Sequence, residues 1–120
     1  MLTVTKEFWF CASHELPGHP TCGVNHGHNY KVEVTFQGVD VGEDMVIDFK
    51  KIKEVVKPII DQLDHSFLNK QIIMPTAENT AKWLYYQIGH QAGSGEISEK
   101  LLEVAVWETP TSSARYRQDG

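Results

Sequence analysis

Residues 26–37 read HGHNYKVEVTFQ, and this stretch decides the fold. Apolar and polar residues alternate along it, and one parity holds His26, His28, Tyr30, Val32, Val34 and Phe36. Successive side chains of a strand point to opposite faces of a sheet, so the alternation predicts a strand with one buried face. The two histidines then lie at the start of this strand and point to the same side.

The segment before it, Thr3 to His14, alternates in the same way and predicts another strand. Residues 15–25 contain Gly and Pro and predict a loop. If the two strands pair antiparallel, the end of the first lies beside the start of the second. We therefore expect the imidazoles of His14, His26 and His28 at one end of the sheet.

Three neutral imidazoles that meet in space are suited to a divalent metal. With zinc, three protein ligands leave the fourth position for water or substrate, which is the pattern of catalytic sites. The alternative is three polar residues at a solvated sheet edge. Because two of the histidines share a strand face and the hairpin supplies the third, we favour the metal site. His19 and His90 are predicted as surface residues.

Cys22 lies four residues before His26 in the same loop. It is either a fourth metal ligand or a thiolate base beside the metal, and spacing alone leaves both readings open. Cys11, inside the first strand, is predicted as a simple buried residue.

The rest of the chain predicts two helices and two further strands. The first helix has Asp48 as its N-cap and ends near Asp64-His65, and the second begins at Thr76. The strands are expected at Leu101–Glu108 and Ala114–Gln118. The order β-β-α-α-β-β indicates an α+β fold: a four-stranded antiparallel sheet with two helices on one face.

Two further sites carry carboxylates of interest. Asp64 beside His65 is either an oriented proton-transfer pair or a polar helix end, and spacing favours the polar end. Glu108 continues the parity of the last long strand. It either binds a ligand rich in N–H donors or marks the exit of the strand into solvent.

Length and charge bound the function. A chain of 120 residues is expected to form one domain, residues 1–120. The formal net charge is −5, which disfavours nucleic-acid binding, since phosphate contacts need clustered Lys and Arg. No apolar run approaches the ~20 residues of a membrane helix, and the first residues do not resemble a signal peptide. We therefore expect a cytoplasmic protein without membrane partners.

Five motifs follow one another in a familiar order: F-C-A-S-H, C-G-V-N-H-G-H-N-Y, L-D-H, P-T-A-E-N and W-E-T. The chain resembles the 6-pyruvoyltetrahydropterin synthase family over its whole length, and most of all the bacterial branch of 6-carboxytetrahydropterin synthases. The three residues between Cys22 and His26 fit that branch, whereas the animal pyruvoyl enzymes have a longer gap. Cys22 also argues against the branch that resembles dihydroneopterin aldolase, which has Glu at this position.

The resemblance implies a tunnelling fold, in which the sheets of several subunits join into a barrel and active sites lie between subunits. A homo-oligomer is expected, with a trimer-based hexamer favoured.

For the site, the resemblance implies one zinc ion per chain on His14, His26 and His28. It makes Cys22 the catalytic thiolate rather than a ligand, and Asp64 with His65 the partners in proton transfer. The residues that hold the pterin would be Glu108, Thr76 and Glu78. Ala77 departs from the family pattern, where Ser or Thr is common, so a side-chain hydroxyl contact is missing.

The implied activity is a zinc-dependent carbon–carbon lyase. It converts 7,8-dihydroneopterin triphosphate to 6-carboxytetrahydropterin, with release of acetaldehyde and triphosphate, on the route to queuosine. The first alternative is the pyruvoyl reaction towards tetrahydrobiopterin. The second is a non-catalytic zinc- or pterin-binding module. Cys22, Asp64, His65 and Glu108 argue against it, since metal binding alone needs none of them.

Overall fold

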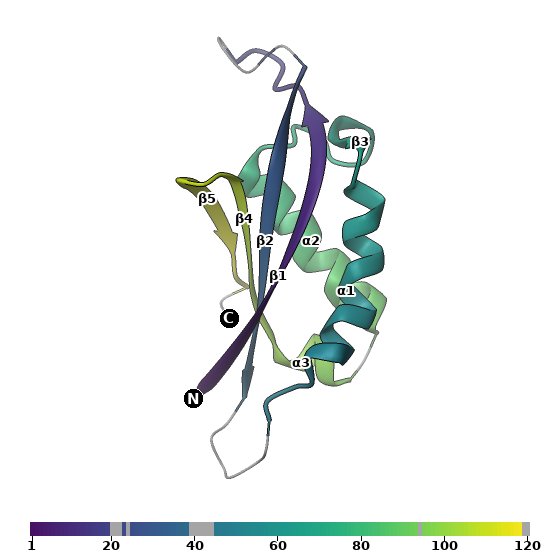
Figure 1. The fold of residues 1–120 in the computed structure, drawn as a ribbon, viewed down its shortest axis with the longest axis vertical. Coiled ribbons are helices and arrows are strands. Elements are labelled where there is room, and N and C mark those ends of the chain that lie inside the picture. The colour runs from purple at the N-terminus through teal and green to yellow at the C-terminus, as the bar shows by residue number, and fades with distance from the viewer. Residues whose placement is uncertain (20–22, 24, 39–44, 94, 119–120) are drawn as a thin grey trace.

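The computed structural model describes residues 1–19, 23, 25–38, 45–93 and 95–118. In chain order these residues form β1 (Leu2–His14), β2 (His26–Gly38), α1 (Phe49–Leu63), β3 (Ser66–Phe67), the 3-10 turn η1 (Leu68–Lys70), α2 (Ala77–Ala92), α3 (Glu96–Lys100), β4 (Leu101–Thr109) and β5 (Ser112–Tyr116). The strands described make one sheet in the order β3-β1-β2-β4-β5. The helices cover one face of it, and the other face is open (Figure 1). The predicted α+β class is confirmed.

The register of the β1–β2 hairpin positions the histidines. His14 is paired with His26, and Ala12 is paired with His28. The end of β1 therefore lies beside the start of β2, as the sequence predicted. All three histidines share the parity of the core residues Phe10 and Tyr30, and this parity faces the helices.

The core lies between the sheet and the helices. The strands contribute alternate residues, including Tyr30, Val32, Val34 and Phe36, each at 0% exposure. From α1 come Ile52, Val56 and Leu63, and from α2 come Leu84 and Ile88, all fully buried. Burying one such side chain contributes about 1.5–3 kcal/mol, so this apolar face keeps the sheet and the helices in fixed positions.

Both long helices begin at the predicted caps. The side chain of Asp48 accepts a hydrogen bond from the backbone N–H of Lys50 at 2.9 Å, and Thr76 Oγ1 accepts one from the N–H of Asn79 at 3.1 Å. These bonds satisfy backbone donors that have no partner within a helix. The caps also fix where each helix meets the site: α1 ends just before Asp64-His65, and α2 begins beside Glu78.

Three details of the predicted sheet and helices need correction. Two short elements were not predicted: β3, which pairs parallel with β1, and α3, between α2 and β4. The last strand lies at Ser112–Tyr116, two residues earlier than expected at each end. β3 has two residues and α3 has five. Such segments are too short to show the apolar alternation of a strand or the apolar repeat of a helix.

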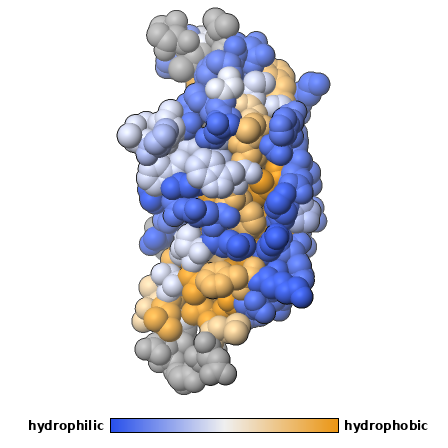
Figure 2. Space-filling model, viewed as in Figure 1, coloured by the Kyte–Doolittle hydropathy of each residue, from blue (hydrophilic) through white to orange (hydrophobic). Residues whose placement is uncertain are grey.

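The surface is mostly polar on the side drawn in Figure 2, and apolar side chains gather at the end of the molecule where β1 begins. Met1, Leu2, Met45 and Phe49 are all strongly exposed. Among the described residues, no helix has both the length and the apolar character needed to cross a membrane.

Candidate functional site

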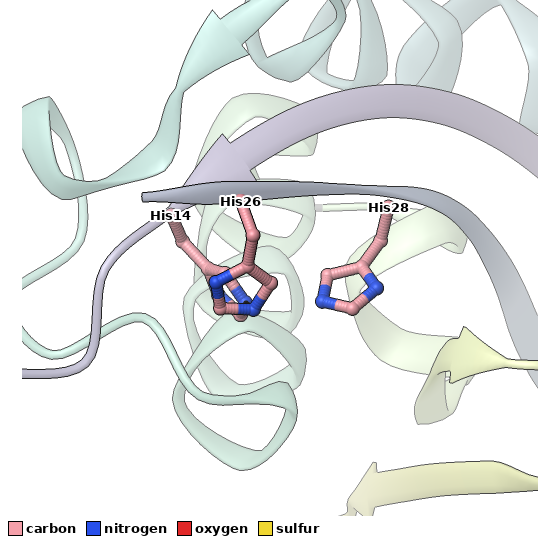
Figure 3. A group of neighbouring side chains, drawn as sticks. All are labelled: His14, His26 and His28. Atoms are coloured by element: carbon pink, nitrogen blue, oxygen red, sulfur yellow. Dashed lines mark hydrogen bonds between the residues drawn. The ribbon is translucent and has the colours of Figure 1, made fainter. Parts of the chain in front are cut away.

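Three imidazoles meet on the helix-covered side of the β1–β2 hairpin. His14 ends β1, His26 starts β2, and their rings turn toward each other and toward His28 (Figure 3). One ligand atom from each residue lies within 4.8 Å of the others. Gly27, between the two β2 histidines, has no side chain, which leaves the opposite face clear at this point. The predicted cluster is therefore present and could hold a metal ion.

His14 is oriented by a backbone carbonyl. It is fully buried, and its Nδ1 lies 2.8 Å from the carbonyl oxygen of Pro75. A carbonyl can only accept, so we assign the proton to Nδ1. Nε2 then carries a lone pair and faces Nε2 of His26 at 3.0 Å. This is the tautomer that a metal ligand requires.

The ring of His28 has the features of a metal ligand. Its Nε2 is buried and has no hydrogen-bond partner among the residues that the structure describes. Desolvation by burial lowers the pKa of His28, although the charge of Glu108 opposes this shift. The neutral imidazole is favoured, and Glu108 Oε1 is 3.4 Å away without hydrogen-bonding geometry. A buried imidazole nitrogen without a hydrogen bond, beside two other imidazoles, fits a divalent metal such as zinc.

Glu108 connects the histidine cluster to a cleft. The cleft has a volume of about 660 Å³, and its walls include His19, Thr76, Glu78 and Glu108. Volumes of this size accommodate small-molecule ligands. The structure thus brings the three predicted substrate residues together. Glu108 is half-buried beside His28, which favours the ligand-binding interpretation over a simple exit into solvent.

His19 is exposed, as predicted, and yet it lines this cleft. The loop position gave no sign of the second property. The turn that places it is closed by a hydrogen bond from the N–H of His19 to the carbonyl of Leu16, at 3.0 Å.

Asp64 and His65 are held by the backbone of Cys11. The N–H of Cys11 donates to Asp64 Oδ1 at 2.9 Å, and the N–H of His65 donates to the carbonyl of Cys11. His65 has a left-handed backbone, with φ of 58°, and its Nδ1 lies 3.2 Å from Asp64 Oδ1. The Cys11 hydrogen bond, with help from His65, lowers the pKa of Asp64. The pair is therefore oriented rather than a loose helix end.

This pair does not belong to the histidine cluster. His65 lines a cavity of about 570 Å³ together with Cys11, Ser13 and Asn29, and His28 is also part of its wall. Cys11, Ser13 and Asn29 have the parity of the open sheet face, whereas the three imidazoles lie on the helix-covered face. Within one chain the two predicted groups thus face different sides of the sheet.

The structure tests the prediction for one of the two cysteines. Cys22 lies outside the described residues, so its role stays a prediction. Cys11 is exposed on the open face, where its thiol donates to Asn29 Oδ1 at 2.8 Å; the prediction that it is buried was wrong. Its parity, opposite to that of Phe10, was the signal available in the sequence.

Sequence reasoning also missed two groups around His14. One is the carbonyl of Pro75, because a backbone acceptor leaves no trace in residue type. The other is Tyr30, whose hydroxyl lies 3.3 Å from His14 Nδ1 and whose ring stacks on Phe10 at 4.7 Å. Burial, and then the charge of Glu108, raises the pKa of Tyr30, so the phenol stays neutral.

Known proteins are similar to this chain in sequence and in fold. A putative 6-carboxy-5,6,7,8-tetrahydropterin synthase of Archaeoglobus fulgidus is 40% identical over 95 residues, covering 79% of this chain and 75% of that protein. The 6-carboxy-5,6,7,8-tetrahydropterin synthase of Haemophilus influenzae is 30% identical over 146 residues, covering 98% and 100%. The structure of Caenorhabditis elegans 6-pyruvoyl tetrahydropterin synthase superimposes with a TM-score of 0.86 at 26% identity, covering 98% of this chain and 96% of that one.

These likenesses confirm the tunnelling fold of the single subunit. The family profile described as 6-pyruvoyl tetrahydropterin synthase matches residues 3–119. Since that match takes in nearly the whole sequence and both motifs and fold agree with it, the chain belongs to the 6-pyruvoyl tetrahydropterin synthase family.

Proposed function

We propose that this protein is a zinc-dependent 6-carboxytetrahydropterin synthase. It converts 7,8-dihydroneopterin triphosphate to 6-carboxy-5,6,7,8-tetrahydropterin, releases acetaldehyde and triphosphate, and serves queuosine biosynthesis. The observation that carries the proposal is the cluster of His14, His26 and His28 beside the cleft that contains Glu108. The names of the archaeal and Haemophilus relatives favour the carboxy product.

His14, His26 and His28 would hold one zinc ion and leave one coordination position for substrate. When bound, zinc polarises oxygen atoms on the substrate side chain as a Lewis acid. Two features of the residues support this role. The Pro75 carbonyl fixes the tautomer of His14, and burial keeps His28 neutral.

Glu108 would anchor the pterin ring. A pterin presents an amino group and a ring N–H side by side, and a carboxylate accepts from both at once. Thr76 and Glu78 share the cleft with Glu108 and would line the ring pocket. Because Glu108 Oε1 is 3.4 Å from His28 Nε2, a ring held there keeps its side chain next to the histidine cluster.

Cys22 would remove a carbon-bound proton, and His65, oriented by Asp64, would deliver or accept the second proton. Asp64 and His65 lie toward the open sheet face, away from the imidazoles of their own chain. We therefore propose that the Asp64–His65 pair completes the site of a neighbouring subunit, in agreement with the intersubunit sites that the resemblance implies.

The test is incubation of the purified protein with 7,8-dihydroneopterin triphosphate, followed by product identification by mass. The proposal expects 6-carboxytetrahydropterin together with acetaldehyde. If the product keeps all three side-chain carbons and no acetaldehyde is released, the protein is a pyruvoyl synthase. If the substrate binds but is recovered unchanged, the protein is a binding module and the proposal fails.

A further inference from the structure

We propose that Asn79 is a positioning residue of the metal centre: it holds the turn that presents the Pro75 carbonyl to His14. This inference rests on the metal site of the proposed function. Asn79 lies in the first turn of α2, and its side chain is exposed. It acts on the cluster through the backbone of residues 74 and 75.

The turn before α2 has an unfavourable backbone. Met74 has φ of 52°, in the left-handed region that side chains with a Cβ rarely adopt. Such a conformation persists only where surrounding contacts over-determine it. Two bonds to one oxygen do so here. The Asn79 side-chain amide donates to the Met74 carbonyl at 2.9 Å, and the N–H of Thr76 donates to it at 2.8 Å.

The side chains of Ile73 and Met74 contribute little packing to this turn. Ile73 is 93% exposed and Met74 is 41% exposed, so neither is anchored in the core. Pro75, which follows, is buried, and its carbonyl accepts from His14 Nδ1 at 2.8 Å. The hydrogen bonds to the Met74 carbonyl therefore fix the left-handed Met74, while the buried Pro75 ring holds the residue that bears the His14 acceptor.

Metal affinity should depend on this chain of contacts. An acceptor on the second nitrogen of a ligand histidine fixes its tautomer and ring direction, and its loss typically weakens metal binding about 10–100-fold. Asn79 acts one bond further out, so the lower end of that range applies.

A simple capping role is separable from this one. The Thr76 cap receives its hydrogen bond from the backbone N–H of Asn79, and the side-chain amide takes no part. Asn79→Ala therefore leaves the cap donor in place and removes only the bond to Met74.

The test measures the zinc dissociation constant by competition with a chelator, in parallel with unfolding of the metal-free protein. Asn79→Ala should bind zinc about tenfold more weakly. The matched control is Gln71→Ala, which removes another exposed side-chain amide that donates to a backbone carbonyl, that of Gln62. The control should bind zinc as the wild type does.

A second substitution tests the route. Glycine adopts left-handed φ without steric cost, so Met74→Gly relieves the conformation that Asn79 maintains. The double variant Met74→Gly, Asn79→Ala should recover most of the lost zinc affinity. In the metal-free protein, the Nδ1–H resonance of His14 should exchange faster with water in Asn79→Ala and return toward wild-type behaviour in the double variant.

The outcomes are distinct. If the wild type binds no zinc, the metal site of the proposed function fails. If the wild type binds zinc and Asn79→Ala binds it equally well, the proposed function stands and this inference is wrong. If Asn79→Ala binds zinc more weakly and the double variant Met74→Gly, Asn79→Ala binds it no better, Asn79 does not act through the left-handed turn. The inference is then also wrong.

Discussion

His14 links the fold to the chemistry at the scale of single residues. Its Nδ1–H bond to Pro75 leaves Nε2 facing His26, 3.0 Å away. With the proton of His14 on Nδ1, this contact is a hydrogen bond in which His26 Nε2–H donates to His14 Nε2. A metal ion on the cluster would take the place of that proton between the two rings. The Pro75 carbonyl therefore leaves His14 Nε2 directed at the cluster, as a metal ligand requires.

Cys22→Ala tests the proposed proton transfer. Three histidines already provide the protein ligands of a catalytic zinc site, and a fourth would close the position needed by substrate. We expect the variant to keep its zinc and its fold and to lose about 10²–10⁴-fold in turnover, the usual contribution of a general base. Zinc content and rate should be measured on one preparation.

The two other results for Cys22→Ala have clear meanings. Loss of zinc would make Cys22 a ligand, and full activity with full zinc would assign the proton transfer to another residue.

The lowered pKa of Asp64 predicts how the free energy of unfolding depends on pH in acid. Its pKa is lowered in the folded protein by the Cys11 N–H and by His65, so the unfolded chain holds the proton more tightly. The stability that Asp64 contributes is present above its unfolded pKa, about 4, and is lost as the pH falls through the lower folded pKa. In Asp64→Asn, the free energy of unfolding should therefore fall less steeply with acid. Denaturant titrations at pH values from about 2 to about 6, which span the folded and unfolded pKa values, would show this difference. Parallel curves for the two proteins would contradict the assignment.

The sequence predicted which side chains meet at this site, but it did not predict the backbone groups that orient them. The parity of residues 26–37 was enough to bring three imidazoles together, since alternation is the dominant rule in a strand. It could not reveal the Pro75 carbonyl or the left-handed Met74, because both depend on how a loop closes against a distant strand. Asp64 and His65 are not part of a repeating apolar pattern, so the sequence did not reveal their orientation. Only their hydrogen bonds to Cys11 show that they are oriented.

At the scale of elements, the cap of α1 can be tested directly. Asp48→Ala removes the acceptor of the Lys50 N–H, and loss of such a cap costs about 1 kcal/mol. Chemical denaturation should show a decrease of this size in the free energy of unfolding, with zinc content unchanged. Asp48→Asn keeps an acceptor and should stay close to the wild type. An unchanged stability in Asp48→Ala would mean that the cap contributes nothing.

Long elements were predictable and short ones were not. β1, β2, β4 and both long helices repeat an apolar period several times, so their type is fixed by many residues at once. β3 exists because the chain leaving α1 runs beside β1 at Ala12 and Ser13, which is a tertiary event. Next to this pairing, the hydrogen bonds to the backbone of Cys11 hold Asp64-His65 against β1.

At the scale of the whole molecule, the described sheet has open edges. β3 pairs with β1 at two positions only, so most of the outer edge of this strand lacks a partner among the described residues, and β5 forms the opposite edge. The open face also presents Trp9, which is 61% exposed. Exposed edges promote pairing with other chains, and closure into a barrel removes them.

We therefore predict a homo-oligomer, with the trimer-based hexamer favoured by the family resemblance. Light scattering at micromolar concentration should return about six times the mass of one chain. A monomer would contradict this prediction and, with it, the proposal that Asp64 and His65 serve a neighbouring subunit.

The central claim is that His14, His26 and His28 form a zinc site, and metal analysis tests it most directly. The wild type should contain one zinc per chain, and the double variant His26→Ala, His28→Ala should contain almost none, because one remaining imidazole cannot retain the ion. The matched control is His90→Ala, which removes an exposed histidine near the end of α2 and should keep full occupancy. Full zinc occupancy in the double variant would contradict the claim.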